Sequence, residues 1–141
     1  MFEYNFKLLR VVDGDTVDVD IDLGFGIWMR KQRIRLMGID TPESRTRDLE
    51  EKKFGLLAKE KLIQLMANST VIKTFKDEKG KFGRILGDFE VYYYDRWGSV
   101  VEVLIKEHYG VKYSGQSKEA IAESHLENRK KLMENGIGNI K

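Results

Sequence analysis

Alternating apolar and polar residues in the N-terminal part of the chain predict a run of β-strands. Residues 6–12, 16–23 and 30–38 are predicted as strands, and residues 16–23 follow the two-residue period of a half-buried strand most clearly. In the second of these, the apolar face is formed by Val17, Val19, Ile21 and Leu23. The opposite face is acidic, and we expect it to be solvated: Asp18, Asp20 and Asp22. The Gly24-Phe25-Gly26 segment then predicts a hairpin turn.

The remainder of the chain mixes helical and strand patterns. Apolar residues at helical spacing predict helices over residues 50–66, 100–106 and 117–134. Residues 70–76 and 84–94 predict two further strands, separated by a charged turn. Three strands, a helix, two strands and two helices are typical of an α+β, mainly β fold. We expect a five-stranded barrel with three helices packed outside it.

Length and composition are those of a globular domain. With 141 residues, of which 41% are apolar and 34% charged, the chain can bury a core, and we expect residues 1–141 to form one domain. It has no cysteine, which excludes disulfides and thiolate chemistry. No signal peptide is visible, which favours the cytoplasm over secretion. The net charge of +2 permits a polyanionic partner without requiring one.

Acidic residues lie at the ends of two predicted strands. Asp15 belongs to the turn that follows the first strand, and Asp40 follows the third. If these strands are neighbours, both carboxylates lie at one end of the sheet, where their repulsion favours a shared proton or cation. No histidine or cysteine is close in sequence, so a hard divalent cation such as Ca²⁺ or Mg²⁺ suits these oxygen ligands best. The alternative is that both aspartates only bond the backbone of their turns.

Arginines accompany these acids. Arg35 shares a strand face with Arg33, and Arg84 follows Gly83 at the start of another predicted strand. A guanidinium group matches two oxygens of a phosphate and keeps its charge at any accessible pH. Each arginine alone also fits an ordinary surface ion pair. The acids and arginines together predict a hard-metal site that faces a phosphate.

Three motifs follow one another along the chain: V-V-D-G-D-T at 11–16, R-L-M-G-I-D-T-P-E at 35–43, and K-F-G-R at 81–84. In this order they resemble the staphylococcal nuclease-like (thermonuclease) family. Residues 125–137 are also similar to the closing helix of that family. The resemblance implies an oligonucleotide-binding (OB-fold) barrel with helices, and Ca²⁺-dependent hydrolysis of phosphodiester bonds in DNA and/or RNA.

The resemblance also implies roles for individual residues of the predicted metal site. Asp15 and Asp40 would bind Ca²⁺ through their carboxylates, and Thr41 would bind it through its main-chain carbonyl. Glu43 would act as the general base, or at least order the attacking water.

Five further residues would contact the substrate, again as the resemblance implies. Arg35 and Arg84 would hold the scissile phosphate as members of the catalytic set. Lys81 and Phe82 occupy positions that touch a terminal phosphate of a bound nucleotide. Phenylalanine replaces the tyrosine of the family's best-known member here, so a hydroxyl contact is lost. Tyr113 falls near a position at which the family stacks an aromatic ring on a base.

Two other functions stay open at this point. A non-catalytic OB-fold module could bind single-stranded nucleic acid, and a protein-interaction module could use tyrosines and tryptophans. Three carboxylates and two arginines favour the nuclease, with DNA or RNA as its partner and no membrane or obligate protein partner. His108 and His125 are interpreted as packed or capping residues. The preference between DNA and RNA, and between endo- and exonucleolytic cleavage, is not predicted.

Overall fold

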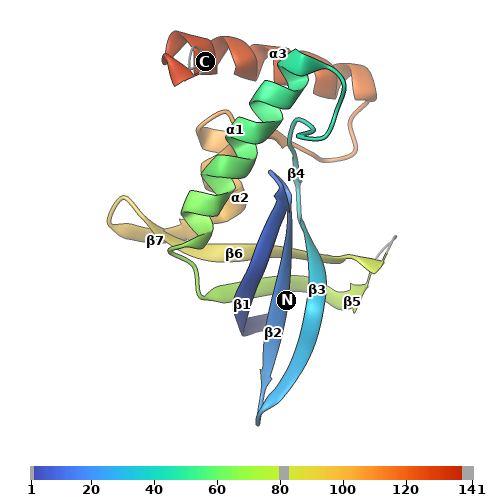
Figure 1. Cartoon of the computed structure of the whole chain (residues 1–141), viewed down its shortest axis with the longest axis vertical. Coiled ribbons are helices and arrows are strands. Elements are labelled where there is room, and N and C mark those ends of the chain that lie inside the picture. The colour runs from blue at the N-terminus through green and yellow to red at the C-terminus, as the bar shows by residue number, and fades with distance from the viewer. Residues whose placement is uncertain (1, 80–82, 138–141) are drawn as a thin grey trace.

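Five β-strands form a closed barrel in the computed structural model, which describes residues 2–79 and 83–137 (Figure 1). The barrel strands are β1 (Phe2–Asp13), β2 (Thr16–Gly24), β3 (Ile27–Leu36), β5 (Val71–Lys79) and β6 (Ile85–Tyr93). They are hydrogen-bonded in the order β3–β2–β1–β5–β6, and a β3–β6 pairing closes the barrel. That closing pair is parallel and the others are antiparallel. The predicted five-stranded barrel is confirmed, as a mixed barrel.

Irregularities in β1 let one long strand serve two sides of the barrel. Residues 2–5 pair with β5, and most of the strand pairs with β2. The β1–β2 register shifts between Leu8 and Arg10 and again before Asp13, and such bulges bend and twist a strand. Fully buried side chains fill the barrel, among them Val17, Val19, Ile34, Ile72, Phe89 and Val91. Removal of this apolar surface from water is the main force that holds the strands together.

Three helices accompany the barrel within the described residues: α1 (Leu49–Met66) and α2 (Val100–Lys106) pack against it, and α3 (Lys118–Glu134) lies beyond α1. Each begins at a side chain that accepts backbone hydrogen bonds from the first turn, namely Asp48, Ser99 and Ser117. α3 crosses the N-terminal half of α1 (Figure 1), where the Arg129 guanidinium lies 5.5 Å from the Phe54 ring centre. None of these described helices has the length and apolar character needed to cross a membrane.

Short strands occur in the described residues where the sequence predicts loops or turns. β4 (Ile39–Asp40) pairs with β8 (Val111–Lys112), which ties the segment after β3 to the loop before α3. β7 (Arg96–Ser99) pairs with β6 and continues the sheet as a hairpin. The turn of this hairpin contains Tyr94 and Asp95, both at positive φ. The sequence pattern predicts this turn at residues 95–98, slightly too far along the chain, because tyrosine is not a typical turn residue.

The outer part of the β2–β3 hairpin also departs from its predicted pattern. Leu23 is 38% exposed, because the hairpin projects beyond the rest of the barrel (Figure 1). Asp20, expected on a solvated face, is only 6% exposed. Its carboxylate accepts hydrogen bonds from the Lys31 backbone (2.8 Å) and the Arg30 guanidinium (3.1 Å), which replace the lost water. The prediction of a solvated acidic face is therefore wrong at Asp20.

Candidate active site

Charged side chains from separate segments of the chain line one cleft of about 480 Å³. The segments are the β1–β2 turn, β3, the β4 region and the residue before β6. We call this the acid–arginine cleft, and it is lined by Val12, Asp13, Asp15, Thr16, Arg33, Arg35, Asp40, Glu43, Arg45 and Arg84. Strand pairing in the barrel brings these distant segments together, so the cleft depends on the fold and not on one local motif.

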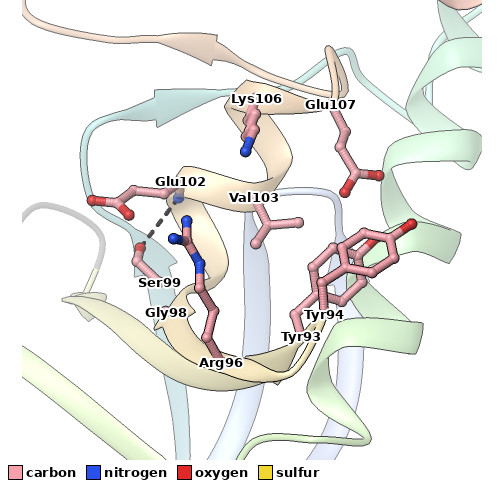
Figure 2. Close-up of a pocket in the computed structure, with 9 residues that line it drawn as sticks. All are labelled: Tyr93, Tyr94, Arg96, Gly98, Ser99, Glu102, Val103, Lys106 and Glu107. Atoms are coloured by element: carbon pink, nitrogen blue, oxygen red, sulfur yellow. Dashed lines mark hydrogen bonds between the residues drawn. The ribbon is translucent and has the colours of Figure 1, made fainter.

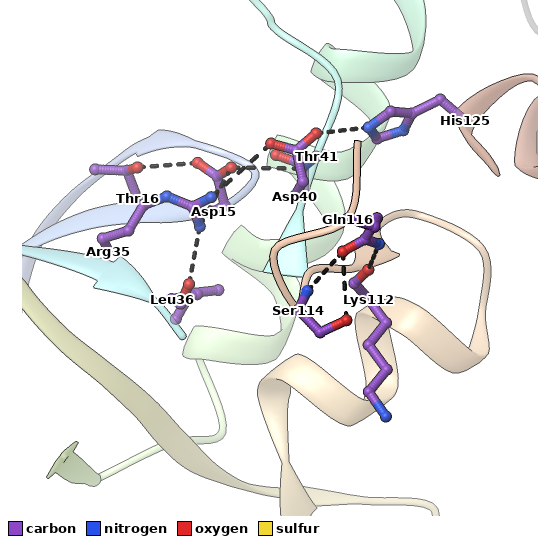
Figure 3. A network of polar contacts seen from close by, with 10 residues as sticks. All are labelled: Asp15, Thr16, Arg35, Leu36, Asp40, Thr41, Lys112, Ser114, Gln116 and His125. Atoms are coloured by element: carbon purple, nitrogen blue, oxygen red, sulfur yellow. Dashed lines mark hydrogen bonds and ion pairs between the residues drawn. The ribbon is translucent and has the colours of Figure 1, made fainter. Parts of the chain in front are cut away.

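Asp15 is held in the β1–β2 turn by three groups. The Thr16 hydroxyl donates to its Oδ1 (2.9 Å), and the Thr41 backbone N–H donates to its Oδ2 (3.3 Å; Figure 3). Nη1 of Arg35 lies 3.5 Å from the same Oδ2. The turn approaches the Thr41 side chain so closely that a Cβ at Gly14 would overlap it. These contacts fix both carboxylate oxygens of Asp15.

Arg35 lies between the two aspartates predicted to bind metal. In the β2–β3 register it stands opposite Thr16, so its side chain emerges beside the β1–β2 turn. Its Nη1 donates to the Leu36 carbonyl (2.8 Å), and its Nη2 lies 3.9 Å from Asp40 Oδ1. Only 18% of the side chain is exposed, so these contacts are less screened than surface ion pairs. The structure thus brings Asp15, Arg35 and Asp40 together, while their roles stay predictions.

Asp40 has a second partner, which no sequence pattern predicts. Nε2 of His125, on α3, lies 2.7 Å from Asp40 Oδ2 (Figure 3). The interpretation of His125 as a packed or capping residue misses this contact, because 85 residues separate the pair in sequence. The similarity of residues 125–137 to the family's closing helix is the signal that pointed to this segment. Asp13 and Arg45 also line the cleft without having been predicted as site residues.

Glu43 lies at the edge of the cleft on a segment whose backbone is firmly packed. Its neighbours Thr41, Pro42 and Ser44 are buried, whereas Glu43 itself is exposed. Proline also restricts the backbone of the residue before it. α1 packs so tightly on this segment that a Cβ at Gly55 would overlap the Glu43 carbonyl. The carboxylate is therefore carried on a fixed support.

The electrostatic surroundings of Glu43 are negative. Although most of the residue is exposed, its pKa is raised above the ordinary glutamate value. The causes are first partial burial and then the negative charges of Asp13, Asp15, Glu51 and Asp40. The pKa is raised despite the arginines that line the cleft, and a bound cation would lower it.

The remaining predicted site residues are placed differently. Arg84 lines the acid–arginine cleft. Tyr113 lies outside the lining; it is 48% exposed, and its backbone N–H donates to the Gly38 carbonyl (2.8 Å). Lys81 and Phe82 lie outside the described residues, so the predictions made for them stay predictions.

Comparison with known proteins identifies the family. The sequence model of the family described as "Staphylococcal nuclease homologue" matches residues 33–136. The chain belongs to this family. It is 33% identical over 85 residues to a thermonuclease of Staphylococcus hyicus. The aligned region covers 60% of this chain and 47% of that protein. It therefore spans about half the length of that relative.

Two other members of the comparison are less informative about activity. An uncharacterized protein of Methanocaldococcus jannaschii is 29% identical over 154 residues, covering 96% of this chain and 70% of that protein. Protein ParB of Escherichia coli is 33% identical over 85 residues, covering 60% of this chain and 41% of that protein. The match to the Methanocaldococcus jannaschii protein shows that similarity to another protein extends over nearly the whole of this chain.

The donor chemistry of the cleft in this staphylococcal nuclease homologue fits a hard divalent cation. Asp15 and Asp40 supply carboxylate oxygens, and the buried Thr41 hydroxyl has no hydrogen-bond partner within residues 2–79 and 83–137. Among those residues, no three acidic or histidine side chains converge as a metal-binding group. Further ligands would have to be backbone oxygens and water, which Ca²⁺ readily accepts.

A second cleft of about 420 Å³ lies between the β6–β7 hairpin and α2 (Figure 2). We call it the hairpin cleft, and it is lined by Tyr93, Tyr94, Arg96, Gly98, Ser99, Glu102, Val103, Lys106 and Glu107. Beside it, Lys61 Nζ lies 2.7 Å from the Tyr93 hydroxyl and 3.0 Å from Glu107 Oε1. Within the described residues, the two clefts share no lining residue, and none of the predicted site residues found there lines the hairpin cleft.

Proposed function

We propose that the protein is a Ca²⁺-dependent nuclease that hydrolyses phosphodiester bonds of DNA and/or RNA, with residues 1–141 acting as one domain. The observation that carries the proposal is the convergence on Arg35 of Asp15, at 3.5 Å, and Asp40, at 3.9 Å. Glu43 and Arg84 line the same cleft. Membership of the staphylococcal nuclease homologue family and similarity to a thermonuclease support the same chemistry.

In this proposal the aspartates provide the metal site. Asp15 and Asp40 would hold the cation through their carboxylates, and Thr41 through its backbone carbonyl. When bound, Ca²⁺ would stabilise negative charge on the phosphoryl oxygens and orient a water molecule. Arg35 would offset part of the repulsion between the two carboxylates, since its guanidinium lies 3.5 Å from Asp15 and 3.9 Å from Asp40.

Glu43 would take the proton from the attacking water. A general base is most effective when its pKa approaches the working pH, and the acids around Glu43 raise its pKa in that direction. The packed backbone on either side of Glu43 would hold the carboxylate at a constant distance from the water, which reduces the entropy lost on reaching the transition state.

The arginines would act on the phosphate. Arg35, on β3, and Arg84, just before β6, approach the cleft from different segments, so each can donate to a different oxygen of the scissile group. Such fixed donors stabilise the transition state, in which charge on these oxygens is greatest, more than the ground state. We extend the proposal to Lys81 and Phe82 at a terminal phosphate and to Tyr113 at a base.

The alternative is an OB-fold module that binds single-stranded nucleic acid without cleaving it. Affinity for a phosphate backbone comes from cations, and four acids in the same cleft would weaken such binding. In a metal-dependent phosphodiesterase, by contrast, acids beside the arginines can bind the cation and take the proton from the attacking water. This observation favours catalysis over binding alone.

Incubation of the purified protein with an end-labelled single-stranded DNA oligonucleotide tests the proposal. We expect cleavage with added Ca²⁺, none in excess chelator, and little with Asp40→Asn, which removes the charge at nearly constant size. The end of each product that carries phosphate identifies which P–O bond breaks. Binding without cleavage in Ca²⁺ would support the alternative, and full cleavage in excess chelator would contradict the metal requirement.

A further inference from the structure

His125 is the one side chain of α3 that reaches an acid of the predicted metal site within the described residues. Its Nε2 lies 2.7 Å from Asp40 Oδ2, and only 13% of its side chain is exposed, against 36% for Asp40. The other oxygen of Asp40, Oδ1, faces Arg35 at 3.9 Å. One carboxylate oxygen is thus held by a buried partner, and the other is directed into the cleft.

The surroundings of the imidazole determine which tautomer is present. Nδ1 of His125 is buried and has no hydrogen-bond partner among the described residues. A proton on Nδ1 would be a buried donor without an acceptor, which costs free energy. The neutral tautomer that fits this geometry therefore carries its proton on Nε2 and donates it to Asp40 Oδ2.

The local support of Asp40 is otherwise slight. Asp40 lies in β4, a strand of two residues whose partner is β8. α3 is joined to the same region by a second contact, in which the Asn128 side chain donates to the Gly110 carbonyl (3.0 Å). Without His125, only the Arg35 guanidinium, 3.9 Å from Oδ1, would restrain the Asp40 carboxylate, and rotation towards Arg35 would turn away the oxygen that faces the cleft.

We propose that His125 is a positioning residue that orients the Asp40 carboxylate and thereby sets the affinity of the acid–arginine cleft for Ca²⁺. This inference rests on the proposed function. Hydrogen-bond partners of metal-binding side chains commonly contribute about 10–100-fold to metal affinity. His125 acts here as the donor that fixes a carboxylate, and it is not itself a predicted ligand.

Calorimetric titration of Ca²⁺ into the full chain, without substrate, tests this role. We expect His125→Leu to bind Ca²⁺ about 10–100-fold more weakly than the unchanged protein. His125→Gln should recover most of the affinity, because its terminal amide can place an N–H where Nε2 was. The matched control is His108→Asn, since His108 is the other histidine and asparagine tolerates its positive φ.

The outcomes separate the two proposals. Unaltered Ca²⁺ affinity in folded His125→Leu, or an equal loss in His125→Gln, would overturn the positioning role while leaving the nuclease proposal intact. No Ca²⁺ binding by the unchanged protein would overturn both. Nitrogen-15 NMR of the imidazole rings in the unchanged protein gives a second test that needs no variant. We expect Nε2 of His125 to carry a proton, and an Nε2 without a proton would contradict the inference.

Discussion

The acid–arginine cleft and the hairpin cleft differ little in size but strongly in how their charges are satisfied. Their volumes are about 480 and about 420 Å³, and each is lined by equal numbers of acidic and basic side chains. Beside the hairpin cleft, burial acts to lower the pKa of Lys61, but hydrogen bonds with Tyr93 and Glu107 raise it overall. In the acid–arginine cleft, partial burial and neighbouring acids raise the pKa of Glu43.

Neither cavity volume nor formal charge balance therefore distinguishes the proposed active site from the hairpin cleft. What distinguishes the acid–arginine cleft is like charge that the fold leaves unrelieved and that a cation would relieve. The cation beside the hairpin cleft already has its partners inside the protein. Variants of the same chemical type, one in each cleft, should therefore differ sharply in their effect on activity.

Replacement of the predicted base should have the largest effect. We expect Glu43→Gln to lower kcat by about 10²–10⁴-fold with little change in KM, because a general base acts in the transition state. Glu102→Gln, in the hairpin cleft, should leave both constants unchanged. Steady-state rates on single-stranded DNA with Ca²⁺ give the comparison. A Glu43→Gln variant that raised KM at constant kcat would argue against the base role.

Removal of an arginine proposed to bind the phosphate should have the next largest effect. We expect Arg35→Ala to lower kcat by about 10²–10³-fold, the usual loss for one fixed donor to the transition state, and Arg84→Ala to behave similarly. Arg96→Ala removes the same side chain from the hairpin cleft and should have no effect. Circular dichroism checks that each variant is folded. Normal turnover by folded Arg84→Ala would remove that residue from the site.

A methyl group at the support of Glu43 should also impair catalysis. Gly55→Ala adds a Cβ that overlaps the Glu43 backbone, so the segment has to shift, and a displacement of about 1 Å can cost about 10²-fold in rate. Gly98→Ala is the control, because a Cβ there meets nothing within 4 Å. The same cleavage assay applies. Equal rates for the two alanine variants would show that the position of Glu43 does not limit the reaction.

The smallest predicted effect concerns the free energy of unfolding and involves Asp88, which accepts a hydrogen bond from Ser99 at the hairpin cleft. Burial raises the pKa of Asp88 above its ordinary value of 3.8, although Ser99 and two backbone N–H groups donate to its carboxylate. A raised pKa means that the stabilising contribution is present below the ordinary value and is lost as pH rises through the folded-state value. Asp88→Asn should therefore gain stability relative to the unchanged protein as pH rises towards neutrality.

Asp18 gives the opposite sign and serves as the control for Asp88. Hydrogen bonds from Arg33 are the main reason that its pKa is lowered, so its contribution is present above the ordinary pKa and is lost as pH falls. Asp18→Asn should consequently lose a small amount of stability at neutral pH. Thermal denaturation at several pH values measures both variants, and parallel pH profiles for the two would contradict the assigned shifts.

Much of the fold follows from local patterns in the sequence. The two-residue period of residues 16–23 and the helical spacing over 50–66 predict elements that the structure contains as β2 and α1. The errors arise where context outweighs pattern. Leu23 is exposed because its hairpin extends past the core, and the β6–β7 turn uses a tyrosine at positive φ. Neither feature can be recognised from the spacing of apolar residues in the sequence.

The features of the candidate site likewise fall into those that the sequence predicts and those that only the fold reveals. Asp15, Arg35 and Asp40 could be brought together from the sequence, because each lies at or near the end of a strand whose neighbour is close along the chain. The contact of His125 with Asp40 could not, since it depends on how α3 returns to the barrel across 85 residues. The negative field at Glu43 likewise depends on the distances between acids of different segments, which only the fold determines.

Mapping of backbone amide shifts on addition of Ca²⁺ to nitrogen-15-labelled protein tests the central claim most directly. We predict saturable shifts for the amides of Asp15, Asp40 and Thr41, none for the β7 and α2 amides around the hairpin cleft, and loss of the response in Asp40→Asn. Shifts gathered around the hairpin cleft, or no shifts at all, would contradict the assignment of the acid–arginine cleft as the metal-dependent site.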